Sequence, residues 1–134
     1  MYGYTGTELA EVLRKSGIEC EFADPDFLVL MLTPAITGDD LQKLVAVLTA
    51  LPRKDAILTA APVIGIPEPV MTIRQAMFSS SEVLPVAQAE GRILSAATVG
   101  CPPAVPVVVC GERIDKAAIE AFQYYGIETC RVCK

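Results

Sequence analysis

The feature that most constrains this fold is the longest charge-free stretch of the chain, Ile93 to Gly111. One glycine and three prolines interrupt its middle. Proline has no backbone N–H and clashes with the preceding helical turn, so the stretch cannot form one helix, either in a core or across a membrane. We therefore predict a strand over residues 92–99, a stiff loop over 101–106 and a second strand over 107–110.

The segments around this stretch predict further short elements. A helix over 72–79 has Ile73, Ala76 and Met77 on one side. Pro85 cannot donate to a β-ladder, which favours an edge strand over 83–86. A second helix over 115–125 and a last strand over 127–132 complete this half of the chain.

The first half predicts an α-β-β-α unit. Thr5 or Thr7 can cap a first helix, and residues 18–23 alternate between apolar and acidic side chains, as in a half-buried strand. Phe27 to Leu32 is apolar at every position, which is typical of a central strand covered on both faces. Thr37 can cap a second helix, whose apolar stripe is made by Leu41, Leu44, Val45 and Leu48.

Together these patterns predict an α+β fold in two parts. Residues 1–52 would form a small mixed or antiparallel sheet with helices packed on one side. Residues 53–134 would form a second small α+β lobe, reached through an extended segment rich in proline between Ala56 and Pro69.

Composition limits the possible partners. Apolar residues make up 52% of the chain and its mean hydropathy is +0.45, so either both faces of its elements are buried or a partner covers apolar surface. The net charge is −5 and the cations are scattered, which disfavours nucleic acid. The first residues lack the basic-then-apolar order of a signal peptide, so we expect a cytoplasmic protein without a membrane partner.

The series from Gly91 to Asp115 resembles a signature of the Orn/Lys/Arg decarboxylase C-terminal domain. In that family a Gly-Arg-Ile/Val strand start leads to Tyr-Pro-Pro-Gly-Ile-Pro, then to apolar residues and Pro-Gly-Glu. Further upstream, residues 72–78, 83–86 and 6–24 are similar to the family's segments that precede this signature. The matching positions of the signature, at the same relative spacing, are Gly91-Arg92-Ile93, Pro102-Pro103, Pro106 and Gly111-Glu112.

Four positions depart from the family pattern. Cys101 replaces the tyrosine before the double proline, Ala104 the glycine after it, and Cys110 the proline before Gly-Glu. Ala96 stands where an acidic or amide residue is common. In the family these positions lie near the mouth of the substrate pocket, so the departures bear on substrate preference and on activity.

The resemblance implies the C-terminal part of a pyridoxal-phosphate-dependent enzyme that decarboxylates lysine, ornithine or arginine. The implied partners are an N-terminal domain that binds pyridoxal phosphate and a second subunit. The implied pocket-rim or interface residues are Cys101, Pro102, Pro103 and Glu112. Glu112 has a second interpretation from the residues alone, as a carboxylate stabilised by the dipole of the following helix.

The residues themselves predict no catalysis in this part of the enzyme. Pyridoxal phosphate needs a lysine that forms a Schiff base, which in the family follows a Ser-x-His pattern. The chain has no histidine, and none of its five lysines has that context. We therefore assign no catalytic, cofactor-binding or metal-binding residue and expect the isolated chain to be inactive.

Two alternatives remain open. One is a stand-alone binding or assembly module without catalysis. The other is a cysteine metal-binding domain built on Cys130 and Cys133 with Cys101 and Cys110. The spacing fits zinc poorly, because the second pair is too far apart in sequence and strand alternation would turn Cys130 and Cys133 to opposite faces.

Overall fold

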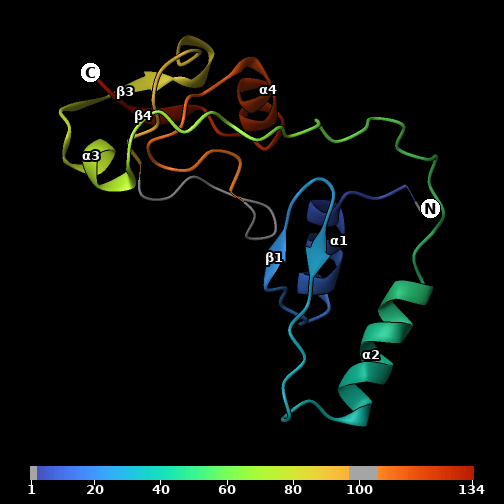
Figure 1. Ribbon diagram of the computed structural model, residues 1–134. Coiled ribbons are helices and arrows are strands. Elements are labelled where there is room, and N and C mark those ends of the chain that lie inside the picture. Colours follow the sequence, from blue (N-terminus) through green and yellow to red (C-terminus); the bar gives the residue numbers. More distant parts are fainter. Residues whose placement is uncertain (1–2, 97–105) are drawn as a thin grey trace. The chain divides into compact units, whose positions relative to one another are not determined.

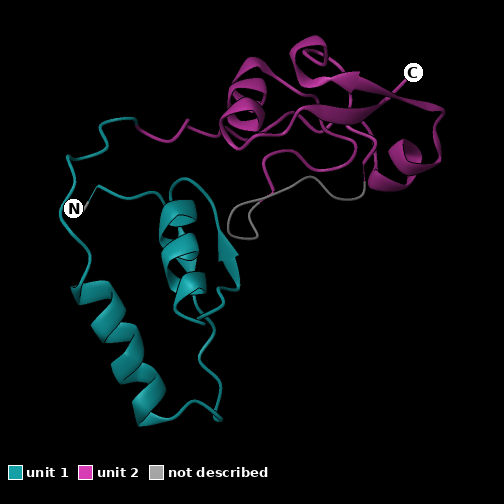
Figure 2. Ribbon diagram, turned by 180° about the vertical axis from the view of Figure 1, so that it is seen from behind, with its two compact units in different colours: residues 1–59 teal, residues 60–134 magenta. Residues whose placement is uncertain are grey.

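The computed structural model describes residues 3–96 and 106–134, in two compact units, Met1–Thr59 and Ala60–Lys134 (Figure 1, Figure 2). Both units combine helices with short antiparallel strands, which confirms the predicted α+β class. The division falls after Thr59, inside the extended segment, whereas the sequence analysis placed the boundary after residue 52. Within the described ranges no helix is both long and apolar enough to cross a bilayer.

Helix α1 (Gly6–Lys15) opens the first unit with a capping box. The Thr5 hydroxyl accepts a hydrogen bond of 3.2 Å from the N–H of Glu8, whose carboxylate accepts one of 3.0 Å from the N–H of Thr5. The helix buries Ala10 and Leu13 and packs beside the hairpin of β1 (Phe22–Ala23) and β2 (Leu28–Val29). The cap therefore fixes where the helix begins on this hairpin.

The hairpin turns through an aspartate. Asp24 Oδ1 accepts hydrogen bonds from the N–H groups of Asp26 at 2.7 Å and Phe27 at 2.6 Å. Gly6 lies against this turn so closely that a Cβ there would overlap the carbonyl group of Phe27. Glycine at the first position of α1 is thus required by the close approach of the hairpin.

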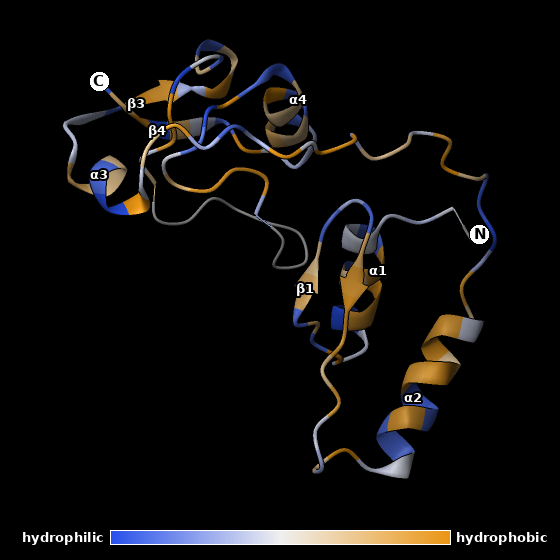
Figure 3. Cartoon of the chain, in the orientation of Figure 1, coloured by the Kyte–Doolittle hydropathy of each residue, from blue (hydrophilic) through white to orange (hydrophobic). Residues whose placement is uncertain are grey.

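Two predictions for the first unit are wrong in extent. Only Leu28–Val29 forms a strand. The predicted run from Phe27 to Leu32 is not covered on both faces, since Phe27 is 49%, Met31 61% and Leu32 64% exposed. Helix α2 (Gly38–Thr49), capped by Thr37 as expected, buries none of its residues. Figure 3 shows the apolar colouring of both segments. Their apolar patterns predict cover that the first unit does not itself provide.

The second unit is built on β3 (Ser81–Pro85) paired antiparallel with β4 (Thr129–Cys133), in the register Ser81–Cys133 to Pro85–Thr129. Backbone hydrogen bonds continue this ladder beyond the named strands. Residues 93–95 pair with β4, residues 111–114 pair with 91–94, and residues 68–71 pair with 111–113. The 3-10 helix η1 (Val86–Gln88) follows β3 directly. Pro85 at the end of β3 agrees with the predicted edge strand.

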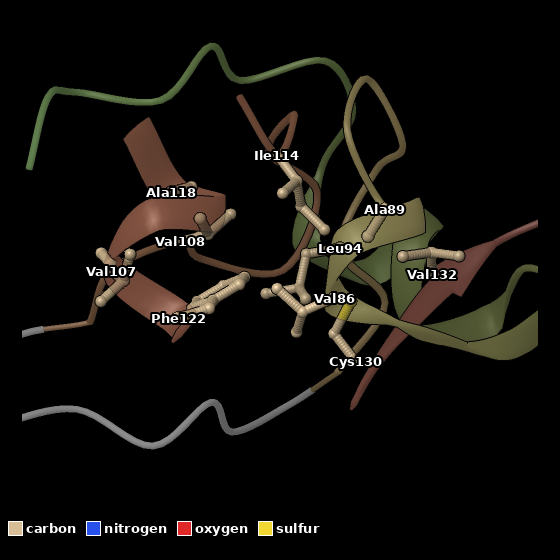
Figure 4. Packing of buried hydrophobic residues seen from close by; sticks show 11 residues of the cluster. Val86, Ala89, Leu94, Val107, Val108, Ile114, Ala118, Phe122, Cys130 and Val132 are labelled. Atoms are coloured by element: carbon tan, nitrogen blue, oxygen red, sulfur yellow. The ribbon is translucent and has the colours of Figure 1, made fainter. Parts of the chain in front are cut away.

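Helices cover the two faces of this ladder. Strand alternation turns Leu94 and Val132 to the side of α4 (Lys116–Tyr124) and turns Ile93 and Cys133 to the side of α3 (Ile73–Phe78). Figure 4 shows the larger of the two clusters. Its buried members are Val86, Ala89, Leu94, Val107, Val108, Ile114, Ala118, Ala121, Phe122, Cys130 and Val132.

Two predictions for the second unit need correction. Residues 107–110 are not a strand: Val107 and Val108 enter the core, and the chain then turns, so that pairing starts at Glu112. In α3 only Ala76 is buried, while Ile73 is 53% and Met77 50% exposed. One apolar residue is enough to anchor so short a helix, and its other apolar side chains face outward.

Candidate functional site

The Gly111-Glu112 pair of the predicted site forms a β-bulge. The N–H of Gly111 donates to the carbonyl of Leu94 at 2.8 Å, while the N–H of Leu94 donates to the carbonyl of Glu112 at 2.9 Å. Two residues therefore oppose one, which bends the strand and re-aims the side chains that follow. Bulges of this kind with a left-handed glycine are common beside functional sites.

A residue other than glycine at position 111 would distort the backbone. Its φ of +96° lies in the left-handed region, and a Cβ there would overlap the carbonyl group of Met71. The carbonyl of Gly111 accepts hydrogen bonds from the N–H groups of Val70 at 3.0 Å and Met71 at 3.1 Å. The glycine thus ties residues 68–71, 93–95 and the 109–112 turn into one scaffold.

The carboxylate of Glu112 is engaged with its own turn. Its Oε2 accepts a hydrogen bond of 2.6 Å from the N–H of Val109, and its N–H donates to the carbonyl of Val109 at 3.0 Å. The Glu112 carboxylate therefore closes the turn before α4 and does not cap that helix. Asp115 takes the capping position instead, accepting from the N–H of Ala118 at 2.7 Å.

The other predicted site residues, Cys101, Pro102 and Pro103, lie outside the described residues, as does Ala104. Nearby described residues, Ser95 and Ala96 before them and Val107 and Val108 after them, are well anchored. Before them, the Ser95 hydroxyl donates to the carbonyl of Ala76 at 3.1 Å, and Ala96 packs against the larger core cluster. After them, Val107 and Val108 are 1% and 2% exposed. The scaffold therefore holds Ser95 and Val107, which lie on either side of the residues that are not described.

Two thiols lie beneath α3. Cys110 Sγ donates weakly to the carbonyl of Ile73 at 3.9 Å, and Cys133 Sγ to that of Ala76 at 3.8 Å. Burial raises the pKa of the Cys110 thiol, and the nearby Cys133 raises it further. The Cys110 thiol therefore stays protonated near neutral pH. Both cysteine side chains act as packing residues that hold α3 in place.

Two arginines to which the sequence reasoning gave no structural role brace the scaffold. Arg92 Nη2 donates to Glu82 Oε1 at 2.7 Å and to the carbonyl of Cys133 at 2.6 Å. Arg113 Nε donates to Glu68 at 2.8 Å, and its Nη1 donates to the carbonyl of Gly91 at 3.0 Å. Arg92 directly precedes the charge-free stretch. A charged residue beside such an apolar stretch is the sequence signal that could have indicated a structural ion pair.

The described residues do not fit pyridoxal phosphate. All five lysines are exposed, and Lys54 is paired with Glu8 at 3.0 Å while Lys116 lies 4.0 Å from Glu120. A Schiff-base lysine instead sits in a desolvated pocket beside groups that hold the cofactor.

A zinc site is also not assembled by the residues that the structure describes. Cys130 belongs to the cluster beside α4 and Cys133 to the cluster beside α3, which confirms that alternation turns them to opposite faces. Across residues 3–96 and 106–134, no three histidine, cysteine or acidic side chains gather as metal ligands would.

These features define a small α+β domain whose arginines, thiols and Gly-Glu bulge hold its own backbone in place. The sequence profile of the Orn/Lys/Arg decarboxylase, C-terminal domain, matches residues 56–129. The chain therefore belongs to the Orn/Lys/Arg decarboxylase family, and the resemblance seen in the sequence is confirmed.

Comparison with individual proteins agrees with this family. The chain is 32% identical over 129 residues to an arginine decarboxylase of Bacillus subtilis, covering 87% of this chain and 25% of the relative. It is 30% identical over 125 residues to an arginine decarboxylase of Bacillus anthracis, covering 88% of this chain and 25% of that relative. The chain thus spans about a quarter of the length of the curated relatives it matches.

Two solved structures share the fold. The constitutive lysine decarboxylase of E. coli superposes with a TM-score of 0.70 at 18% identity, covering 98% of this chain and 28% of that one. The lysine decarboxylase of Francisella novicida gives a TM-score of 0.71 at 14% identity, covering 100% of this chain and 29% of that one. At such identities the likeness concerns the fold alone.

Proposed function

We propose that this chain is the C-terminal part of a pyridoxal-phosphate-dependent decarboxylase of lysine, ornithine or arginine. The observation that carries the proposal is the family match over residues 56–129, supported by the similarity to two arginine decarboxylases. The reaction would release carbon dioxide and leave a diamine or agmatine, which places the enzyme in polyamine formation. Arginine is the substrate to test first, because it is named for both curated relatives.

In this proposal the chain supports an active site whose catalytic lysine lies in another part of the enzyme. Its five exposed lysines and its lack of histidine fit a supporting role, since neither the Schiff-base lysine nor its Ser-x-His context is present. The cofactor would be held by an N-terminal domain. The complete enzyme would be a cytoplasmic homodimer or higher oligomer, with contacts to nucleic acid and membrane playing no part.

The pocket rim or subunit interface would be formed by Cys101, Pro102, Pro103 and Glu112. The support is the anchoring of the scaffold: the bulge at Gly111 and the hydrogen bond from Ser95 to Ala76 hold fixed points on both sides of the proline-rich loop. A loop that is stiff and held at its ends would shape a neighbouring pocket at low entropic cost.

Absorbance spectroscopy tests the assignment of the cofactor. Pyridoxal phosphate added to the isolated chain should give no protein-bound band at about 420 nm, because that band needs a Schiff base to a lysine. A band that disappears when one of the five lysines is replaced would overturn the proposal. Incubation with arginine, lysine and ornithine should likewise release no carbon dioxide.

A chimera tests the supporting role directly. The quarter of the Bacillus subtilis arginine decarboxylase that matches this chain would be replaced by it, and cofactor binding and decarboxylation would be measured separately. We expect the chimera to bind pyridoxal phosphate and to have reduced activity, which the double variant Cys101→Tyr and Ala104→Gly raises. A chimera that folds but binds no cofactor would contradict the proposal.

A stand-alone binding or assembly module is the second candidate. The observation that favours it is that the described residues of each unit form helices and paired strands of their own. The coding sequence upstream of Met1 separates the two candidates. A continuous reading frame with a Ser-x-His-Lys motif would eliminate the stand-alone module.

A further inference from the structure

The second strand of the hairpin in the first unit has an open edge. In an antiparallel ladder, residues alternate between bonding to the partner strand and facing away from it. The N–H of Asp24 donates to the carbonyl of Phe27 at 3.0 Å, and Phe22 is paired with Val29. Phe27 and Val29 therefore face β1, and the backbone groups of Leu28 and Leu30 are directed to the other edge.

That edge has no partner within the described residues. Outside the β1–β2 ladder, the backbone hydrogen bonds of residues 3–96 and 106–134 include none to Leu28 or Leu30. A strand edge of this kind presents N–H and C=O groups that can pair with another strand. Proteins usually protect such an edge with proline, lysine or another charge, and the run from Phe27 to Leu32 contains none of these.

The side chains of the same run are those of an interior strand. All six residues are apolar, yet Phe27 is 49%, Met31 61% and Leu32 64% exposed. Strands that are apolar at every position are normally covered on both faces and paired on both edges. The run thus has the sequence of a central strand and the surroundings of an edge strand.

We propose that the outer edge of β2 takes a further β-strand, supplied by the part of the longer decarboxylase that lies outside this chain. This inference rests on the proposed function. The F. novicida structure covers 100% of this chain, hairpin included, with 29% of its own length, so most of that protein is available to supply a strand. A strand of the same polypeptide pairs at a high effective concentration, which favours it over a second copy. The added segment would be extended, uncharged and apolar.

Hydrogen exchange tests the proposal at the predicted atoms. The probe is the portion of the B. subtilis arginine decarboxylase that lies outside its similarity to this chain, added to the full chain. Exchange at the N–H groups of Leu28 and Leu30 should slow by at least about tenfold, because both become bonded. The N–H of Val29, which already bonds to β1, is the internal reference and should change little.

Matched variants identify the edge. Leu30→Pro removes an outward N–H and should abolish the protection and the binding. Met31→Lys places a charge on an exposed position of the same run and should weaken binding at least about tenfold without disturbing the core. Val83→Pro is the control, since the register of β3 and β4 turns the N–H of Val83 to an outer edge as well, and binding should be unchanged.

A peptide scan makes the result independent of how the added portion folds. Overlapping peptides of about twelve residues, longer than a typical strand, would cover that portion. We expect one extended apolar peptide to protect Leu28 and Leu30. If neither the portion nor any peptide protects them, the proposal is wrong. It is also wrong if protection grows with the concentration of this chain alone, because the occupant is then a second copy.

The failure of this inference can be separated from failure of the proposed function. If this chain, mixed with the added portion, decarboxylates arginine while the N–H groups of Leu28 and Leu30 exchange at unchanged rates, the proposed strand is wrong and the proposed function is retained. A mixture that protects both N–H groups but releases no carbon dioxide from arginine, lysine or ornithine would keep the strand and count against the function.

Discussion

The carboxylate of Glu112 accepts a hydrogen bond of 2.6 Å from the backbone N–H of Val109 and thereby closes the turn that precedes the β-bulge. The contact is solvent-exposed, so its net contribution is modest. Glu112→Ala should destabilise the chain by about 1 kcal/mol, the usual worth of such a bond. Urea unfolding measures the difference.

Glu112→Gln is the control for this prediction. Glutamine keeps an acceptor oxygen at the same reach and should retain most of the stability. In the chimera with the Bacillus subtilis enzyme, Glu112→Gln would also test whether Glu112 acts at the pocket rim. The substitution removes the charge but leaves the turn closed, so a change in decarboxylation would be due to the charge. If Glu112→Ala unfolds at the same urea concentration as the natural chain, the turn does not depend on this carboxylate.

Gly111→Ala should be among the most damaging small substitutions. The φ of +96° is strained for alanine, and its Cβ would overlap the carbonyl of Met71. We expect a loss of about 2 kcal/mol or more, from backbone strain with the overlap added. Gly126→Ala is the matched control, because Gly126 has a φ of +73° and nothing lies within 4 Å of its Cβ position.

The two glycine variants should therefore differ in chemical denaturation. Gly126→Ala should lower the free energy of unfolding by only about 1 kcal/mol, the cost of a left-handed backbone conformation for alanine. If both variants lose the same free energy of unfolding, the backbone near Met71 moves away from the alanine at position 111 without a measurable energetic cost, which would contradict this prediction.

Local signals in the sequence located the helices well. Thr5, Thr37, Thr72 and Asp115 each cap the helix that was expected to follow, because a capping side chain acts on backbone within four residues. What the sequence could not give is the partner of each apolar face. The stripe of α2 and the run from Phe27 to Leu32 have the pattern of buried segments, yet the first unit leaves most of their side chains exposed.

The candidate site shows the same limit. The Gly-Glu pair was found from its motif, but its role as a bulge depends on Leu94 and Met71, which are distant in sequence. The strand expected over 107–110 is absent because a short run of apolar residues does not distinguish a strand from a segment whose side chains enter a core, as those of Val107 and Val108 do. Arg92 and Arg113 were missed because their acceptors are mostly backbone carbonyls and remote carboxylates.

The core of the second unit depends on Phe122. Its side chain is fully buried among the residues of the larger cluster (Figure 4). Phe122→Ala should cost about 3 to 5 kcal/mol through lost burial and a cavity. Phe78→Ala is the control, since Phe78 is 81% exposed, and it should change stability by less than about 0.5 kcal/mol. Near-UV circular dichroism during denaturation follows both; similar losses would contradict the core assignment.

The capping boxes of α1 and α2 should make the first unit sensitive to acid. The backbone N–H of Thr5, with Lys54, lowers the pKa of Glu8 below 4.5, and the hydroxyl and N–H of Thr37 lower the pKa of Asp40 below 3.8. A carboxyl whose pKa is lower in the folded state stabilises the fold above its ordinary pKa. That contribution is lost as the pH falls through the folded value.

Both helices should therefore loosen at their first turns in acid, because the stabilisation from Glu8 declines once the pH is below its ordinary pKa of 4.5, and that from Asp40 below its ordinary pKa of 3.8. Hydrogen exchange of the N–H groups of Glu8 and Asp40 measures the loosening. Glu8→Gln and Asp40→Asn are the controls, because each keeps an acceptor oxygen that does not titrate. Comparing the natural chain with the double variant at each pH removes the pH dependence of the intrinsic exchange rate, which both share. Protection should fall with acid in the natural chain and stay level in the double variant. A parallel fall in both would show that the caps do not depend on these charges.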